Sequence, residues 1–363
     1  MEDKFIPVCE PYLNGNELKY VTDAISTGWI SSAGKYVSEF EKQFAAYCDC
    51  KYGVAVCNGT VSLHLALVAM GIGKGDEVII PTFTMIASAF AVCYTGATPV
   101  FVDADKETWN IDVAKIEEKI TSRTKAIMPV HIFGQMCEMD KITEIAKKHN
   151  LFVLEDAAEA HGATYNRRKA GSYSDIASFS FFANKNITTG EGGMLVTNDE
   201  ELYNKARYFK NVCFPLDGNR NYMHEDIGFN YRMSNVIAAI GLAQVEKADE
   251  YKSMRINNND LYRRYLNALS VSWMNAIVVD PQLYGHTKDE LISYLKQHNI
   301  DTRLLFTGMH RQPSLKKYGC DIKGEYPASD WLTQNGLYLP SASSLSEETI
   351  ERICCLIRDF ASK

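Results

Sequence analysis

The sequence predicts an α/β protein built on a largely parallel sheet, with a large domain followed by a smaller one. Short apolar runs alternate with segments of helical apolar spacing from about residue 53 to residue 200. Strands that alternate with helices in this way usually lie parallel and are covered by helices on both faces. The alternation ends near residue 240, where a long amphipathic segment begins. Hydrophobic residues make up 46% of the 363 residues and charged residues 23%, which is ordinary for a folded globular chain.

The elements are predicted in the following order. Strands are expected over 52–57, 76–81, 98–105, 124–130 and 151–157, and helices over 60–71, 84–96, 111–120 and 138–149. Past residue 240, the patterns predict a long helix over 244–269, a strand over 272–280, a helix over 287–298 and a strand over 301–306. The change of pattern divides the chain into a large α/β domain, residues 1–245, and a smaller α+β domain, residues 246–363.

Charge and composition exclude several classes of protein. The net charge is −7 and the sequence pI is about 5.7, so we expect no binding to nucleic acid or to an anionic membrane surface. No stretch approaches the roughly 20 apolar residues of a membrane span, and the first residues lack a secretory pattern. The ten cysteines lack the paired spacing of a zinc site. We therefore expect a cytoplasmic protein with free thiols and no metal.

Polar residues follow several of the predicted strands, at the sheet edge where α/β proteins bind ligands. Gly59 and Thr60 open a helix, whose first N–H groups can bind a phosphate. Taken alone, this turn favours an ordinary helix start with Thr60 as the N-cap over a phosphate site. Asp156 ends another apolar strand, and Ser180 and Lys185 end or follow a third. A buried lysine is costly without a partner or a function, although Lys185 alone also fits a strand end in solvent.

Together these residues match the needs of pyridoxal 5′-phosphate (PLP). A lysine forms a Schiff base with this cofactor, as Lys185 would do here. A carboxylate such as that of Asp156 keeps the pyridine nitrogen protonated. The helix start at Gly59 and Thr60, with the Ser180 hydroxyl, would bind the phosphate. A dinucleotide site instead requires a G-x-G-x-x-G turn after a strand, and the glycine cluster over 188–193 precedes a strand and lacks that spacing.

The sequence is similar to the sugar aminotransferases of the DegT/DnrJ/EryC1/StrS family, which have the aspartate aminotransferase-like fold type I. The resemblance runs along nearly the whole chain. It includes "NGTVSLHLAL" (58–67), "EDAAEAHGA" (155–163), "SFSFFANKNITTGEGGM" (178–194) and "GFNYRMSN" (228–235). The resemblance implies that residues 1–245 form the PLP-binding domain.

The resemblance also implies a role for each matching residue. Lys185 would bear the cofactor and move the proton, and Asp156 would pair with the pyridine nitrogen. The other cofactor-binding residues implied are Gly59, Thr60 and Ser180 at the phosphate, Glu159 near the 3′-oxygen, Met85 at the ring face, and Asn230 at the phosphate from the second subunit of a homodimer. The substrate-binding residues implied are Trp29, Ser31, His310 and Arg232.

Lys185 favours transamination, because relatives that dehydrate a sugar at C3 carry histidine at this position. The segment around Lys185 most resembles that of perosamine synthases, which transfer the amino group of L-glutamate to C4 of GDP-4-keto-6-deoxymannose. The sequence departs from the family at Met85, where an aromatic residue is usual, at Phe90 and Met136, over 303–315, and in a short connection over 265–273. These departures leave other ketones open: a UDP- or dTDP-4-ketosugar, an inosose or a small phosphorylated ketone. A non-catalytic sensor is a further alternative.

Three histidines lie near the predicted site elements. His64, on the first helix of the alternating region, is expected to be a packed core residue. His131 and His161 follow predicted strands, so either a contact with the site or a packing role is open for them.

Overall fold

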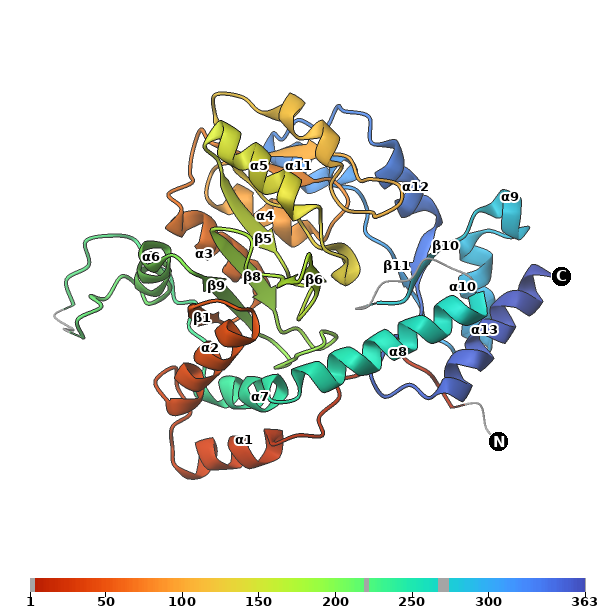
Figure 1. Ribbon diagram of the computed structural model, residues 1–363, viewed down its shortest axis with the longest axis horizontal. Helices are drawn as coiled ribbons and strands as arrows, with labels where there is room; N and C mark the ends of the chain where they lie inside the picture. Colours follow the sequence, from red (N-terminus) through yellow and green to blue (C-terminus); the bar gives the residue numbers. More distant parts are fainter. Residues whose placement is uncertain (1–3, 219–221, 267–273, 363) are drawn as a thin grey trace.

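The computed structural model describes residues 4–218, 222–266 and 274–362. Its centre is a seven-stranded sheet in the order β1-β9-β8-β5-β4-β2-β3, shown in Figure 1. The strands are β1 (Tyr52–Val56), β2 (Glu77–Pro81), β3 (Thr98–Val102), β4 (Thr124–Ile127), β5 (Phe152–Asp156), β8 (Ile176–Ser180) and β9 (Gly193–Thr197). The pairs from β8 to β3 are parallel, and β9 runs antiparallel to both of its neighbours. The predicted fold class, a mostly parallel sheet, is confirmed.

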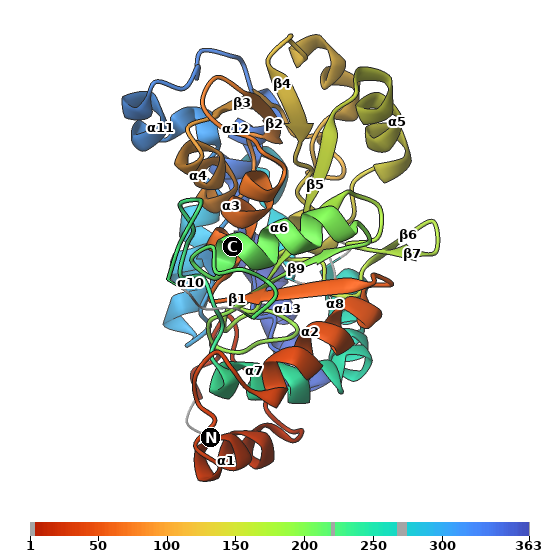
Figure 2. The ribbon, with the colours of Figure 1, turned by 90° about the vertical axis from the view of Figure 1, so that its left-hand side faces the viewer.

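Helices cover both faces of this sheet, as Figure 2 shows. One face packs against α3 (Gly59–Ala69), α4 (Ile86–Tyr94) and α6 (Glu200–Lys210). The other packs against α1 (Glu17–Ser26), α2 (Lys35–Tyr47), α5 (Met139–His149) and α7 (Asn235–Val245). The alternation of strand side chains explains the division: in β1, Val54 and Val56 belong to the first core, and Ala55 belongs to the second.

The C-terminal part is built around α8 (Ala248–Leu266) and a small antiparallel sheet in the order β10-β12-β11. Its strands are β10 (Ala276–Val278), β11 (Arg303–Leu304) and β12 (Gly336–Tyr338), and its other helices are α9 (Pro281–Tyr284), α10 (Lys288–Gln297), α11 (Pro313–Tyr318), α12 (Pro327–Asn335) and α13 (Glu347–Ala361). In Figure 1, α8 runs from the large sheet to α13, and the two helices share a buried core. A separate hairpin, β6 (Thr164–Tyr165) with β7 (Arg168–Lys169), follows β5.

Two predicted helices differ from those found. The segment 111–120 forms two 3-10 turns, Val113–Lys115 and Glu117–Lys119, because its N–H groups bond three residues back, as in Ile116 to Val113. The segment 244–269 is divided, since α7 ends at Val245 and α8 begins at Ala248. Residues 267–273 lie outside the described residues. They include the end of the predicted helix, the first two residues of the strand predicted over 272–280, and most of the short connection over 265–273.

The boundary predicted at residue 245 falls at the junction of α7 and α8. Contacts cross it, however, because Leu315 of α11 and Tyr326 pack into the same core as α3 and α4. The division into two domains stays a prediction. Across the described residues, no helix is long and apolar enough to cross a membrane.

Candidate active site

A cavity of about 620 Å³ opens at the carboxyl ends of the parallel strands. Its wall brings together residues from separate elements of the sheet and from the C-terminal part. The residues predicted from sequence that line it are Gly59, Thr60, Met85, Asp156, Glu159, Ser180 and Lys185. The seven therefore line one cavity, and the roles assigned to them stay predictions.

The start of α3 forms an open, polar wall of this cavity. The side chain of Asn58 accepts the N–H of Val61 at 3.0 Å, so Asn58 is the N-cap and the alternative with Thr60 as the cap is wrong. The first N–H groups of a helix lack intrahelical partners, which leaves those of Gly59 and Thr60 available to a ligand. A Cβ atom on Gly59 would lie 2.7 Å from the Cβ atom of Ser180, so only glycine allows β8 and α3 to approach this closely. The helix start and the Ser180 hydroxyl thus form one cradle that suits an anion.

Asp156 is the last residue of β5 and is 4% exposed. Its Oδ2 atom accepts the hydroxyl of Ser88 at 2.8 Å, and its Oδ1 atom accepts the N–H of Ala158 at 3.3 Å. Burial raises the pKa of this carboxyl group, while the Ser88 hydrogen bond and the charge of Lys185 oppose the rise. The carboxylate is fixed by two donors and lines the cavity.

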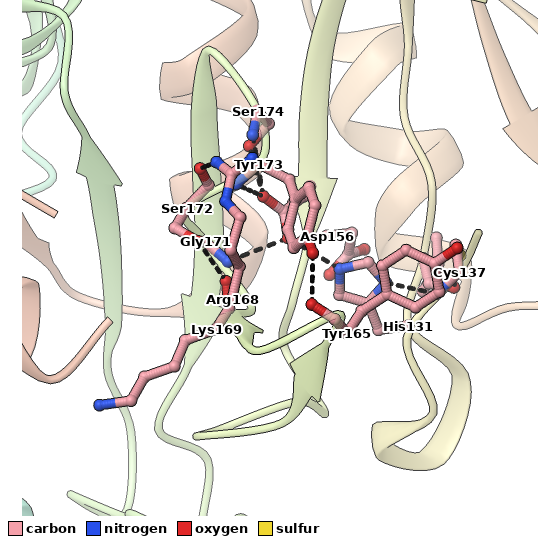
Figure 3. Close-up of polar contacts among 12 residues, drawn as sticks. His131, Cys137, Asp156, Tyr165, Arg168, Lys169, Gly171, Ser172, Tyr173 and Ser174 are labelled. Carbon is pink, nitrogen blue, oxygen red and sulfur yellow. Dashed lines mark hydrogen bonds and ion pairs between the residues drawn. The ribbon is translucent and has the colours of Figure 1, made fainter. Parts of the chain in front are cut away.

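Glu155 lies next to Asp156 but points to the opposite face of the sheet, because successive strand residues alternate. Its carboxylate accepts the N–H groups of Gly171, Tyr173 and Ser174 at 2.9–3.1 Å and contacts Nε2 of His131 at 2.9 Å. Figure 3 shows His131 and the loop of residues 171–174 beside β5. Glu155 therefore holds the structure beside the site, whereas Asp156 belongs to the cavity.

Lys185 lies on the loop between β8 and β9, five residues after the strand ends at Ser180. Its Nζ atom is 3.7 Å from Oε1 of Glu159, and the two side chains are 10% and 6% exposed. Burial lowers the pKa of Lys185 and raises the pKa of Glu159 to about 7. The Oε2 atom of Glu159 accepts the N–H of Phe133 at 2.8 Å, and Phe133 holds the left-handed φ of 50°.

Four of the predicted site residues lie outside this cavity, on neighbouring segments. Trp29 is 59% exposed, and the carbonyl groups of Trp29 and Ser31 accept N–H groups of Asn235 at 2.6 and 2.7 Å. Asn230 is exposed, and Arg232 donates to Asn211 at 2.9 Å beside a separate hollow of about 220 Å³. None of these side chains reaches the cavity within one chain.

His310 also lies outside the cavity lining. Its Nδ1 atom is 2.9 Å from the hydroxyl of Thr82, and its Nε2 atom is 2.8 Å from Oδ1 of Asp330. Its ring stacks on Tyr326 with the centroids 4.6 Å apart. Within one chain, His310 therefore joins α12 to the end of β2.

The three histidines named from the sequence, His64, His131 and His161, are packed residues. His64 is 5% exposed, and burial lowers its pKa, as expected for a core residue. His131 bonds to Glu155 behind the site. His161 is buried among Phe44, Phe179 and Phe181, and burial lowers its pKa to about 3.

Several cavity residues were missed by sequence reasoning. Thr84, just before α4, lines the cavity, and Ser88, in the first turn of α4, bonds Asp156. Phe133, Phe306 and Tyr338 form an aromatic wall, with the first two rings stacked at 5.5 Å. Phe306 and Tyr338 come from the C-terminal part, and no local pattern indicates their approach.

Comparison with known proteins places this geometry in a family. Residues 11–358 match the model of the DegT/DnrJ/EryC1/StrS aminotransferase family. The chain is 46% identical to GDP-perosamine synthase of Escherichia coli O157:H7, with 99% of each chain aligned. It is 48% identical to GDP-perosamine synthase of Caulobacter vibrioides, with 96% of each chain aligned. The fold is similar to that of 3-amino-5-hydroxybenzoic acid synthase, with a TM-score of 0.92, 29% identity, and coverage of 99% of this chain and 100% of that one. The protein therefore belongs to the DegT/DnrJ/EryC1/StrS aminotransferase family.

Proposed function

We propose that this aminotransferase transfers the amino group of L-glutamate to the C4 keto group of a nucleotide-linked 4-keto-6-deoxy sugar. The best candidate is GDP-4-keto-6-deoxymannose, which would give GDP-perosamine. The observation that carries this choice is the identity of 46% and 48%, over almost the full length, to two GDP-perosamine synthases. The cavity residues support the reaction, and the relatives support the sugar.

The cofactor is PLP, and the residues of the cavity fit it. The cradle of Gly59, Thr60 and Ser180 suits its phosphate, since a Cβ atom on Gly59 would fill the space beside Ser180. Asp156 presents a fixed carboxylate, which suits a protonated pyridine nitrogen. When bound, PLP supplies an electron-withdrawing ring that stabilises negative charge on the carbon atom losing its proton.

Lys185 is suited to two tasks. Burial lowers the pKa of its amine, which increases the neutral fraction that can attack a carbonyl carbon. The same amine, when free, can accept a proton from one carbon atom and return it to another. Burial raises the pKa of Glu159, 3.7 Å away, to about 7, so the charge beside this amine changes near neutral pH.

We also propose that the working enzyme is a homodimer with shared sites. Among the described residues that line the cavity, Lys185 is the only cationic side chain, beside the acids Asp156, Glu159 and Glu191. A nucleotide sugar and a phosphate need more positive charge than this. Arg232, which is half-buried, and Asn230, which is exposed, lie close together in the sequence and outside the cavity of their own chain. A second copy would bring such groups to the site.

The alternative is a different ketone. Met85 and Phe306 line the cavity, so two of the departures from the family reach the substrate space. By contrast, Phe90 packs beside Tyr94, and Met136 packs between two cores away from the cavity.

The test is a panel of ketones with L-glutamate as the donor and 2-oxoglutarate release as the measurement. The panel contains GDP-4-keto-6-deoxymannose, UDP- and dTDP-4-ketosugars, an inosose and a small phosphorylated ketone. The proposal predicts that the GDP sugar gives the highest kcat/KM. A higher value for another ketone would reassign the substrate, and no conversion of any ketone by PLP-loaded protein would favour a sensor.

A further inference from the structure

Asp156 receives its shorter hydrogen bond from a side chain outside the predicted site. Ser88, in the first turn of α4, is 0% exposed, and its hydroxyl donates to Oδ2 of Asp156 at 2.8 Å. The second donor, the N–H of Ala158, is 3.3 Å from Oδ1. The position of the carboxylate therefore depends on α4 as well as on β5.

A second hydroxyl continues this contact toward the cavity. The Oγ1 atom of Thr84 lies 3.2 Å from the Oγ atom of Ser88, and Thr84 is 2% exposed and lines the cavity. A hydroxyl has one proton to donate, and an ionised carboxylate only accepts. Since Ser88 donates to Asp156, Thr84 must donate to Ser88. An ionised Asp156, which can only accept, fixes this direction from Thr84 through Ser88 to the carboxylate.

The hydrogen bond from Ser88 acts against the effect of burial. Burial raises the pKa of Asp156, and the Ser88 hydroxyl lowers it by bonding the charged form. The charged groups that face Asp156 are Lys185 and His131, which also favour the carboxylate, and Glu159, whose own pKa Asp156 raises. Ser88 is the uncharged member of this set and contacts the carboxylate directly.

We propose that Ser88, supported by Thr84, is a positioning residue that keeps Asp156 ionised and aimed at the ring nitrogen of the cofactor. This inference rests on the proposed function, in which Asp156 pairs with that nitrogen. Ser88 itself does not line the cavity. Its effect on the reaction passes through the charge and orientation of Asp156.

The chain offers a matched control. Ser329 is also 0% exposed, and its hydroxyl donates to Oδ1 of Asp103 at 2.6 Å, at a place that does not line the cavity. Ser329→Ala therefore removes the same kind of buried hydrogen bond without touching the site. Ser88→Thr keeps the hydroxyl, and Ser88→Cys keeps the volume of the side chain with a much weaker donor.

The experiment uses PLP-loaded protein and measures the Kd for PLP and the pH midpoint of the cofactor's absorbance band. Ser88→Ala is expected to raise the Kd about 10-fold, because a hydrogen bond to a charged group is lost. It should move the pH midpoint by roughly 0.5 unit or more, and lower kcat more than it changes KM. Ser88→Cys should behave in the same way, which keeps the test valid if the alanine variant does not fold. Ser88→Thr should restore the wild-type values, and Ser329→Ala should leave them unchanged.

The outcomes distinguish a failure of the Ser88 role from a failure of the proposed function. If wild-type protein binds PLP and transaminates but the Ser88→Ala and Ser88→Cys variants keep its Kd and pH midpoint, Ser88 only packs α4 on the sheet and the inference is overturned. If wild-type protein shows no cofactor band, the proposed function itself fails, and the inference falls with it.

Discussion

The Nζ atom of Lys185 lies 3.7 Å from the Oε1 atom of Glu159, and both side chains are buried in the wall of one cavity. Burial disfavours the charged form of each group, so the pKa of the lysine falls and that of the glutamate rises to about 7. Glu159 therefore changes its protonation near neutral pH, next to the lysine that would transfer a proton in transamination.

The pH dependence of stability tests the buried state of Glu159. Its pKa is raised from 4.5 to about 7, so the folded protein keeps a proton that the unfolded chain has already lost between these values. Stability should therefore fall as the pH rises through this window, by up to about 3 kcal/mol. Glu159→Gln removes the cost, so the variant should gain thermal stability over wild type at about pH 8 and not at about pH 4.

The measurement for Glu159 is the Tm of cofactor-free protein across this pH range. Glu144→Gln, at an exposed position of α5, is the control and should show no pH-dependent difference from wild type. A Glu159→Gln variant that tracks wild type at every pH would contradict a buried, proton-holding Glu159.

Substitutions of Asp156 and of its neighbour Glu155 are expected to affect different properties, activity for Asp156 and stability for Glu155. Asp156→Asn keeps the shape of the side chain but removes the charge, so kcat/KM should fall by roughly three orders of magnitude or more with little change in Tm. Glu155→Gln weakens the acceptor for three backbone N–H groups and should lower the free energy of unfolding by about 2 kcal/mol. Thermal denaturation and steady-state kinetics on both variants provide the comparison. Equal losses of stability for the two variants would show that Asp156 is a structural residue.

The closeness of Gly59 to Ser180 predicts the effect of one added methyl group. Gly59→Ala places a Cβ atom 2.7 Å from the Cβ atom of Ser180, so the cradle must widen. The Kd for PLP should rise about 10-fold or more, as expected when an anion loses well-placed N–H donors. Gly73→Ala is the control, because its nearest heavy atom is the carbonyl oxygen of Thr95 at 3.8 Å. The affinity for PLP is measured by fluorescence titration. An unchanged affinity in Gly59→Ala would contradict the proposal that the phosphate binds at this helix start.

Mixed dimers test whether Asn230 acts from the second subunit. Asn230→Ala and Lys185→Ala should each be inactive as pure dimers under this proposal. In a mixed dimer, one site combines the intact Lys185 of one chain with the intact Asn230 of the other. In a random equal mixture about half of the dimers are mixed and each has one working site, so about a quarter of the wild-type activity should return. Failure to recover activity, with mixed dimers verified by two affinity tags, would contradict shared sites.

The sequence predicts the parts of the site that depend on local pattern. Asp156 and Ser180 end apolar strands, and Gly59 opens a helix directly after one, so strand ends alone bring them to the same sheet edge. Lys185 was expected at a strand end and is found on the following loop, since β8 already stops at Ser180. The sheet class follows from the same alternation.

Other parts depend on packing between distant segments. Ser88 sits in a helix that reads as uniformly apolar, and only its contact with Asp156 distinguishes it. Tyr338, the last residue of β12, lines the cavity, and the sequence around it contains no pattern that predicts this position. The segment 111–120 has helical apolar spacing, and Val113 and Ile116 are buried. Its backbone hydrogen bonds are nevertheless of the 3-10 type and not of the α-helical type. The resemblance assigns His310 to the substrate, which stays a prediction; within the chain its ring contacts Thr82 and Asp330.

In the proposed reaction, PLP is bound to Lys185 and leaves this lysine when it takes up the amino group of L-glutamate. An absorbance spectrum tests this most directly. Purified protein loaded with PLP should show a band near ~410–420 nm that moves to about 330 nm when L-glutamate is added. Lys185→Ala should abolish catalytic turnover, whereas Lys125→Ala, at an exposed position of β4, should retain it. A wild-type protein with no band after addition of PLP, or with a band that glutamate leaves unchanged, would contradict the assignment.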